Sequence, residues 1–219
     1  MSLADDLESD LSWRESELVI LKRLAVTASG GSVREKALLR AMLALLYAHY
    51  EGFCKYAWQL YVDAIESELP TRGALQSPLI CLSLEDHFTQ LRNNASDNDL
   101  LDFHRKVLPK LLNKPVKFSA TLEADSNLSP DRYCENMNRA CLPYKEIKER
   151  RSLLRSLVAR RNGIAHGESA FIENVSEYNK YEDAAIIVMH ELAISIIDSI
   201  DKKLYLSNSN NEKHISDKN

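Results

Sequence analysis

One stretch decides the fold: residues 32–68, which read SVREKALLRAMLALLYAHYEGFCKYAWQLYVDAIESE. Ser32 is followed three residues later by Glu35, the spacing of a helix N-terminal capping box, and Pro70 stands just beyond the stretch. Apolar residues are nearly continuous from Leu38 to Tyr47. We therefore predict one long helix that is buried on more than one face, by other helices and by a second subunit.

The rest of the chain is also predicted to be helical, because no strand-like alternation of useful length occurs. Further helices are predicted over residues 11–28, 130–141, 144–166 and 178–205. Between residues 71 and 143, prolines and a polar run weaken the helical pattern, which indicates an insertion of short helices and loops. The prediction is an all-α, up-and-down bundle forming a single domain over residues 1–206, followed by a disordered Ser/Asn/Lys-rich tail over residues 207–219.

Composition limits the classes of function. The chain has 219 residues, with 28 basic and 32 acidic side chains and a net charge of −4, so no global positive field attracts nucleic acid and any RNA contact must be local. Its four cysteines lack the C-x2-C spacing of a zinc site, and we predict neither a metal nor a cofactor. No signal-like or membrane-spanning apolar run is present, and a cytoplasmic location is predicted.

A second stretch, residues 153–168 (LLRSLVARRNGIAHGE), places polar side chains where a helix should be apolar. Arg161 falls on the buried stripe of this helix, while Asn162 and His166 are neighbours at i and i+4. Gly167 predicts the helix end, which puts His166 in the last turn. A buried guanidinium without a partner costs on the order of 3–5 kcal/mol, so Arg161 needs an internal salt bridge or a bound anion.

Three stretches of the chain also carry a family resemblance. Residues 161–166 (RNGIAH) resemble the R-x4-H motif of HEPN domains. Together with SNLS at 126–129, YAHYEGF at 47–53 and the flanked motif RRNGIAHGE at 160–168, they resemble one prokaryotic HEPN subfamily over roughly residues 10–205. The resemblance implies a helical bundle that forms a homodimer and joins two motifs into a composite, metal-independent site that cleaves RNA. Many members act as toxins or in defence systems.

The resemblance assigns the catalytic residues as Arg161, Asn162 and His166. In RNA cleavage by the 2′-hydroxyl, His166 would act as general base or acid, because an imidazole exchanges protons near neutral pH. Arg161 would clamp the scissile phosphate with its planar fork, and Asn162 would orient His166 or a phosphate oxygen. The expected product is a 2′,3′-cyclic phosphate from single-stranded RNA, and DNA would be inert.

Other charged residues are weaker candidates. Basic side chains exceed acidic ones on the motif helix and could hold a phosphate backbone, although a solvated helix face explains them as well. The RNA-binding candidates are Lys148, Arg151, Arg155 and Arg160. Glu51 and Glu168 are candidates for supporting roles. Toxins paired with a nucleotidyltransferase antitoxin carry a modified tyrosine at the position of Glu168, so a partner of that type is not predicted, and another antitoxin or regulatory protein stays open.

Two alternatives accompany the nuclease hypothesis. The first is a non-catalytic HEPN module that binds a nucleotide or RNA through Arg161 and His166 and dimerises for regulation. The second is a purely structural helical dimer, in which Arg161 pairs with an acid such as Glu51 across the bundle. The structural dimer predicts a carboxylate partner for Arg161, whereas the nuclease and the binding module both leave it open to an anion and differ in whether RNA is cleaved.

Overall fold

The computed structural model describes residues 2–119, 122, 127–168 and 172–207. Within these ranges the regular elements are helices, together with two isolated β-bridges, Thr71 to Pro115 and Leu75 to Leu206. The predicted all-α fold is confirmed. The predicted disorder of residues 207–219 falls, except for Ser207, outside the described residues.

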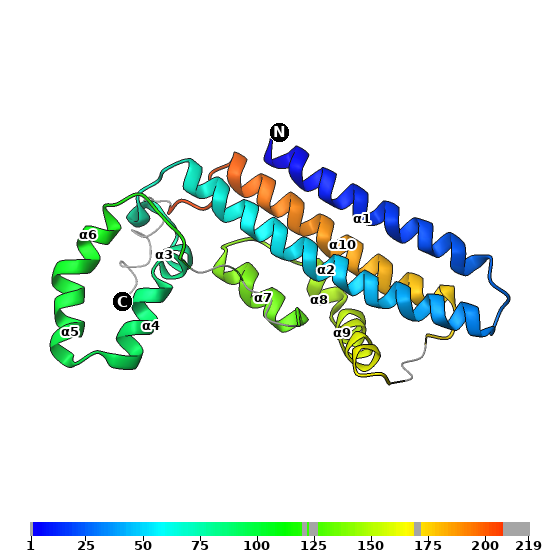
Figure 1. Ribbon diagram of the computed structural model, residues 1–219. Coiled ribbons are helices and arrows are strands. Elements are labelled where there is room, and N and C mark those ends of the chain that lie inside the picture. Colours follow the sequence, from blue (N-terminus) through cyan, green and yellow to red (C-terminus); the bar gives the residue numbers. More distant parts are fainter. Residues whose placement is uncertain (1, 120–121, 123–126, 169–171, 208–219) are drawn as a thin grey trace, which may run out of the picture.

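Three long helices form the main layer of the molecule (Figure 1). They are α1 (Leu3–Val26), α2 (Val33–Ser67) and α10 (Val175–Asp201). The predicted long helix is thus present, and its 35 residues span about 52 Å. It buries 15 side chains, more than α1 or α10, because α1, α9 and α10 all pack on it.

The start of α2 uses the predicted cap with one change of partner. The Ser32 hydroxyl accepts a hydrogen bond from the Glu35 amide at 3.1 Å. The Glu35 carboxylate returns not to the Ser32 amide but to that of Gly31, at 2.6 Å. Gly31 has φ +73°, a left-handed conformation that favours glycine and brings its amide within reach. The cap therefore also fixes the turn between α1 and α2.

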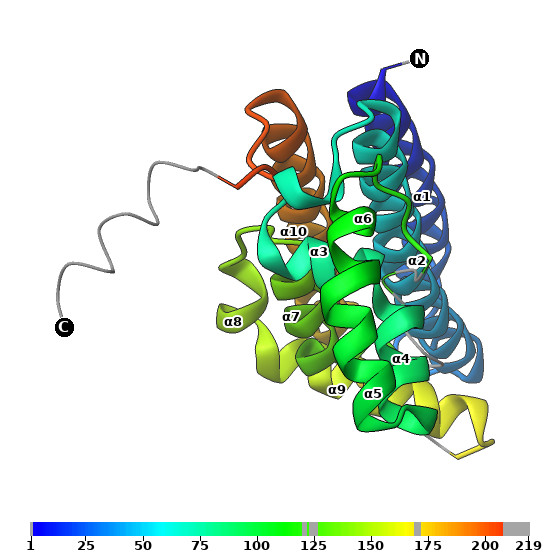
Figure 2. The same ribbon diagram turned by 90° about the vertical axis from the view of Figure 1, so that its left-hand side faces the viewer.

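Residues 71–119 form an arm at one end of the layer, seen end-on in Figure 2. Its elements are η1 (Arg72–Ala74), α3 (Ser77–Ser83), α4 (Glu85–Asn94), α5 (Asp97–Asp102), η2 (Phe103–Val107) and α6 (Leu108–Leu112). Of these, η2 is a π turn, which joins α5 to α6 in one rod. From α4 to α6 no described side chain is fully buried. The predicted status of residues 71–143 as an insertion stays a prediction.

The motif region consists of α7 (Pro130–Arg139), α8 (Glu146–Glu149) and α9 (Arg151–Ala165). The prediction of one helix over residues 144–166 was wrong, because the chain breaks at Arg150, whose φ and ψ are −102° and 10°. A carboxylate from α10 caps the start of α8: Glu191 accepts hydrogen bonds from the amides of Lys145, at 2.7 Å, and Glu146, at 3.1 Å. A tertiary contact thus supplies the cap of α8.

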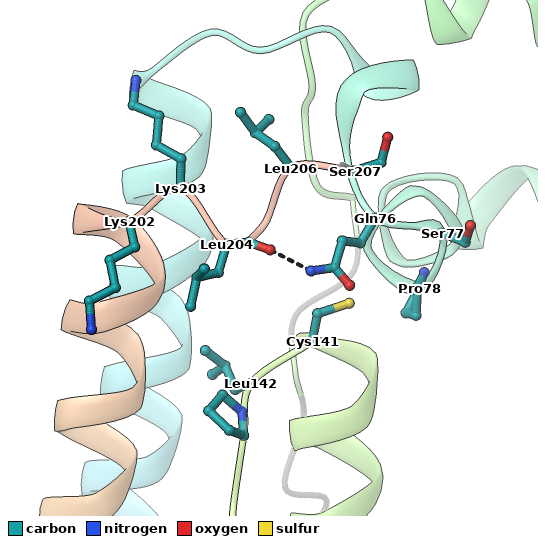
Figure 3. A pocket seen from close by; sticks show the side chains of 11 residues that line it. Gln76, Ser77, Pro78, Cys141, Leu142, Lys202, Lys203, Leu204, Leu206 and Ser207 are labelled. Carbon is teal, nitrogen blue, oxygen red and sulfur yellow. Dashed lines mark hydrogen bonds between the residues drawn. The ribbon is translucent and has the colours of Figure 1, made fainter. Parts of the chain in front are cut away.

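A cavity of about 840 Å³ lies where the chain leaves α10 (Figure 3). Its wall includes Pro78, Leu142 and Leu204, and a hydrogen bond from the Gln76 amide nitrogen to the Leu204 carbonyl crosses it. None of the residues assigned to the catalytic site lines this cavity. None of the described helices is long and apolar enough to span a bilayer.

Candidate functional site

The motif helix α9 ends as the sequence predicted. Gly167, with φ +78°, donates its amide hydrogen bond to the Ile164 carbonyl at 3.1 Å, and the Glu168 amide donates to the Gly163 carbonyl at 2.8 Å. This pair of bonds is a Schellman motif with Gly167 at the left-handed position. His166 is the C-cap residue, and its side chain is exposed. Among the described residues, no hydrogen bond or ion pair holds its ring.

Arg161 is half-buried and is held by neutral groups. Its guanidinium lies 4.6 Å from the centre of the Tyr47 ring, on α2. Its Nη1 donates to the amide oxygens of Asn162 at 3.0 Å and Asn127 at 3.3 Å. Its Nε and Nη2 donate to no described residue. The side chain is therefore positioned from three segments, while half of its planar fork stays available.

Tyr47 links the motif helix to the segment before α7. Its hydroxyl accepts a hydrogen bond from the Leu128 amide at 2.7 Å, which fixes Asn127 beside Arg161. Burial raises the pKa of Tyr47 well above its ordinary value, and the Glu51 carboxylate raises it further; the Leu128 amide and Arg161 act in the opposite direction. The phenol is therefore neutral at physiological pH, and Arg161 stacks on an uncharged ring.

Glu51 does not pair with Arg161. Only 13% of the Glu51 side chain is exposed, and the carboxylate accepts from Lys55, one helical turn further along α2, at 2.8 Å. In the described part of the chain, no Asp or Glu forms an ion pair with Arg161. The arrangement expected of a purely structural salt bridge between Arg161 and Glu51 is thus not found.

The predicted RNA-binding residues mostly have acidic partners. Arg151 and Arg155 both pair with Asp131 on α7, the latter at 3.2 Å. Arg160 pairs with Glu177 on α10 at 2.8 Å. Lys148, on α8 rather than α9, lies 4.5 Å from the centre of the Tyr144 ring. The positive charge predicted for this helix is therefore largely neutralised, although such surface pairs are worth only about 0–1 kcal/mol each.

Glu168 contributes through its backbone. Its carbonyl accepts a hydrogen bond from the Arg40 guanidinium on α2 at 2.9 Å, and its side chain is exposed. This bond ties the segment after His166 to the main layer. The Glu168 carboxylate forms no hydrogen bond or ion pair with a described residue, so its supporting role stays a prediction.

Sequence reasoning did not assign Tyr47, Asn127 or Asp131 to the site. The first two belong to stretches that carry the family resemblance, yet nothing in their spacing places them beside Arg161. Tyr47 precedes Glu51 by one helical turn, which was the only local signal that both share a face. Asp131 follows an N1 proline and looked like an ordinary first-turn acid.

The opposite side of α2 carries a second polar cluster. Arg14 on α1 is 9% exposed, donates to Asp10 at 2.6 Å and approaches Nδ1 of His49 at 3.4 Å. Nε2 of the buried His49 lies 2.9 Å from a carboxylate oxygen of Glu17. Burial lowers the pKa of His49, as does Arg14, although Glu17 opposes the shift. This cluster joins α1 to α2, and its polar groups contact one another.

The all-helical fold is consistent with one class of protein, the HEPN domain. A family model described as HEPN_MAE_28990-like HEPN matches residues 3–205, and the chain belongs to this family. No curated protein and no solved structure matches the chain.

Membership sets the coarse limits of function. HEPN domains are often ribonucleases, others are non-catalytic, and they commonly bind RNA and dimerise. In the described part of the chain, no group of three His, Cys, Asp or Glu side chains is arranged to hold a metal ion. The guanidinium of Arg161, which has no ion pair with a described acid, is one group with a geometry suited to an anion.

Proposed function

We propose that the protein is a metal-independent endoribonuclease, which cleaves single-stranded RNA at a site composed of two R-x4-H motifs. One observation carries the proposal: Arg161 is a half-buried cation held in place by Tyr47, Asn127 and Asn162, all neutral, with no described acid paired to it. A guanidinium kept oriented and uncompensated favours an anionic ligand. A phosphodiester fits its planar fork.

The reaction that suits these residues is transesterification. One His166 takes the proton of the ribose 2′-hydroxyl, and the 2′-oxygen attacks phosphorus, forming a new O–P bond. The bond to the 5′-oxygen breaks, and the second His166 protonates that leaving group. Arg161 stabilises the charge that builds on the phosphorane oxygens. The products are a 2′,3′-cyclic phosphate and a 5′-hydroxyl, and DNA cannot react because it lacks the nucleophile.

The need for a second subunit follows from the position of His166. Each chain supplies one such imidazole, at an exposed helix end, whereas the reaction needs both a base and an acid. A homodimer that apposes the two helix ends supplies both groups. We further propose that the activity serves a toxin or defence role in the cytoplasm, under the control of an antitoxin or regulatory protein.

The deciding experiment incubates purified protein with labelled single-stranded RNA and with DNA of the same sequence, in EDTA. The matched variant is His166→Ala, whose exposed side chain leaves the melting temperature unchanged. We expect cleavage of RNA only, cyclic-phosphate ends and no product from the variant. Cleavage by His166→Ala at the wild-type rate, or cleavage of DNA, would contradict the mechanism.

A non-catalytic HEPN module is the second candidate. It is favoured by the absence of any described partner that orients the His166 ring, since a general base is usually held in position. In that case Arg161 binds an RNA phosphate without turnover. RNA binding that is lost in Arg161→Met, together with no cleavage by the wild type, would identify this function.

A further inference from the structure

The arm carries a run of positive charge. Residues 103–119 read FHRKVLPKLLNKPVKFS, with five lysines and arginines and no acidic residue. The chain as a whole has 28 basic and 32 acidic residues, so the remainder has 23 and 32 and carries a charge of −9. A local positive field thus stands on an otherwise acidic molecule.

Most of these cations lack ion-pair partners in the described structure. Lys106 pairs with Asp102 at 2.9 Å, one turn before it. Arg105, Lys110 and Lys114 are exposed and form no ion pair with any described residue, and the same holds for Lys117. This contrasts with α9, where the predicted RNA-binding arginines face acids.

The backbone beneath these cations is anchored from the inside. The Arg72 guanidinium donates to three carbonyls of the segment, those of Leu111 at 3.4 Å, Pro115 at 3.3 Å and Lys117 at 3.2 Å. The Val116 amide donates to the Pro70 carbonyl at 2.8 Å. A segment held in this way presents its charges in a fixed arrangement, which lowers the entropy cost of binding.

Most apolar side chains of the segment are at least half-buried, so the cations make up much of its free surface. Val116 is 1% exposed, and a Cβ at Gly73 would lie 3.5 Å from that of Leu112. Val107, Pro109 and Pro115 are exposed, and the other apolar side chains of residues 103–119 are half-buried or buried. A helix that inserts into a membrane instead exposes a broad apolar face beside its cations. The charges here are therefore suited to a polyanion in water.

We propose that residues 103–119 of the arm bind the phosphate backbone of the RNA substrate, away from the cleavage site. The inference rests on the proposed function for the identity of the substrate. The arm and α9 lie beneath the same three-helix layer, with α7 between them (Figure 1). Single-stranded RNA held on the arm therefore reaches the motif without crossing the layer. Lys106 lies in η2, Lys110 lies in α6 and Lys114 follows the end of α6, so the three cations are spread along the segment, which suits contacts to separate phosphates.

The test measures binding directly, in a His166→Ala background that keeps the RNA whole. The arm variant carries Arg105→Gln, Lys110→Gln and Lys114→Gln. The matched control carries Arg23→Gln, Arg34→Gln and Lys180→Gln. All six positions are exposed and without ion pairs to described residues, and either triple moves the net charge from −4 to −7.

Affinity for single-stranded RNA is measured by fluorescence anisotropy at several salt concentrations. Each phosphate contact to a single strand contributes about 0.7 to the slope of log K against log salt. The arm triple should therefore lower that slope by about 2 and weaken binding about a hundredfold at 0.1 M salt. The control should change the slope by less than about 0.5, and Lys110→Gln alone should weaken binding about fivefold.

The outcomes separate the inference from the function on which it rests. Equal losses in the two triples, or no loss in the arm triple, would overturn the arm as the RNA surface. Loss of binding to anionic lipid vesicles, with RNA affinity unchanged, would also overturn it and identify a membrane surface. If the wild type fails to cleave RNA while the arm triple alone loses affinity, the ribonuclease proposal fails and the RNA-binding arm stands.

Discussion

Replacing Arg161 with methionine should abolish activity with little change in stability. The substitution removes two hydrogen bonds to neutral amides and a cation–π contact with Tyr47, the latter worth about 0.5–2 kcal/mol. It also removes the cost of keeping a half-buried guanidinium partly desolvated, which is several kcal/mol for a fully buried ion and less here. Methionine fills a similar volume and packs on the same ring. We expect these effects to cancel within about 1 kcal/mol.

For a domain of this size, 1 kcal/mol corresponds to a shift of about 2–4 °C in melting temperature. Loss of the phosphate clamp should lower the single-turnover rate of RNA cleavage about 10²–10³-fold, as removal of a charge-stabilising donor does elsewhere. Arg161→Lys keeps the charge but lacks the fork, and should also be slow. Thermal melting and cleavage in EDTA test both statements. A fall of more than about 10 °C in Arg161→Met, roughly 3 kcal/mol, would show that the arginine is structural and refute the reasoning.

Three further predictions concern the surroundings of the site. Tyr47→Phe leaves the Leu128 amide without its acceptor and should cost about 1–3 kcal/mol in free energy of unfolding, measured by urea titration; no loss would mean that water replaces the hydroxyl. Gly167→Ala places a Cβ on a residue with φ +78°, which should lower the free energy of unfolding by about 1–2 kcal/mol and slow cleavage. Gly30→Ala is the neutral control, because Gly30 lies in open space and has no positive φ. The pKa of His49 is lowered in the folded state, so the unfolded chain binds more protons and stability should fall as the pH drops below about 6.5. The fall in melting temperature between about pH 7.5 and about pH 5.5 should be smaller in His49→Gln than in the wild type. An equal fall in the two proteins would show that His49 does not cause the pH dependence.

Local signals in the sequence predicted several helix ends, although α1 begins at Leu3, eight residues before its predicted start. Ser32 with Glu35, Ser129 before Pro130, and Gly167 after His166 all mark helix ends that the structure shows. These signals act within a few residues, so the order of the chain is enough to find them. The break at Arg150 escaped prediction because no proline or glycine marks it, and the cap at the start of α8 comes from Glu191, about 45 residues away on α10.

The sequence indicated where the motif residues lie on their helix, but not which residues of other segments surround Arg161. The spacing on α9 placed Arg161 on the buried stripe and His166 in the last turn, whereas in the structure Arg161 is half-buried and His166 is the C-cap residue. The groups that surround Arg161 come from α2 and from the segment before α7, and only the tertiary fold brings them together. The partners of Arg151 and Arg155 were missed for the same reason, since a count of charges along one helix omits acids on its neighbours.

The hydrogen bond from the Leu128 amide to the Tyr47 hydroxyl gives the site a built-in reporter. An amide held in this way exchanges its hydrogen for deuterium only when the segment separates from α2. Its exchange rate therefore measures how often Asn127 leaves Arg161, without any substitution or ligand. Slower exchange after RNA is added would show that bound RNA closes this contact, and faster exchange after a regulatory protein is added would show that this protein opens it.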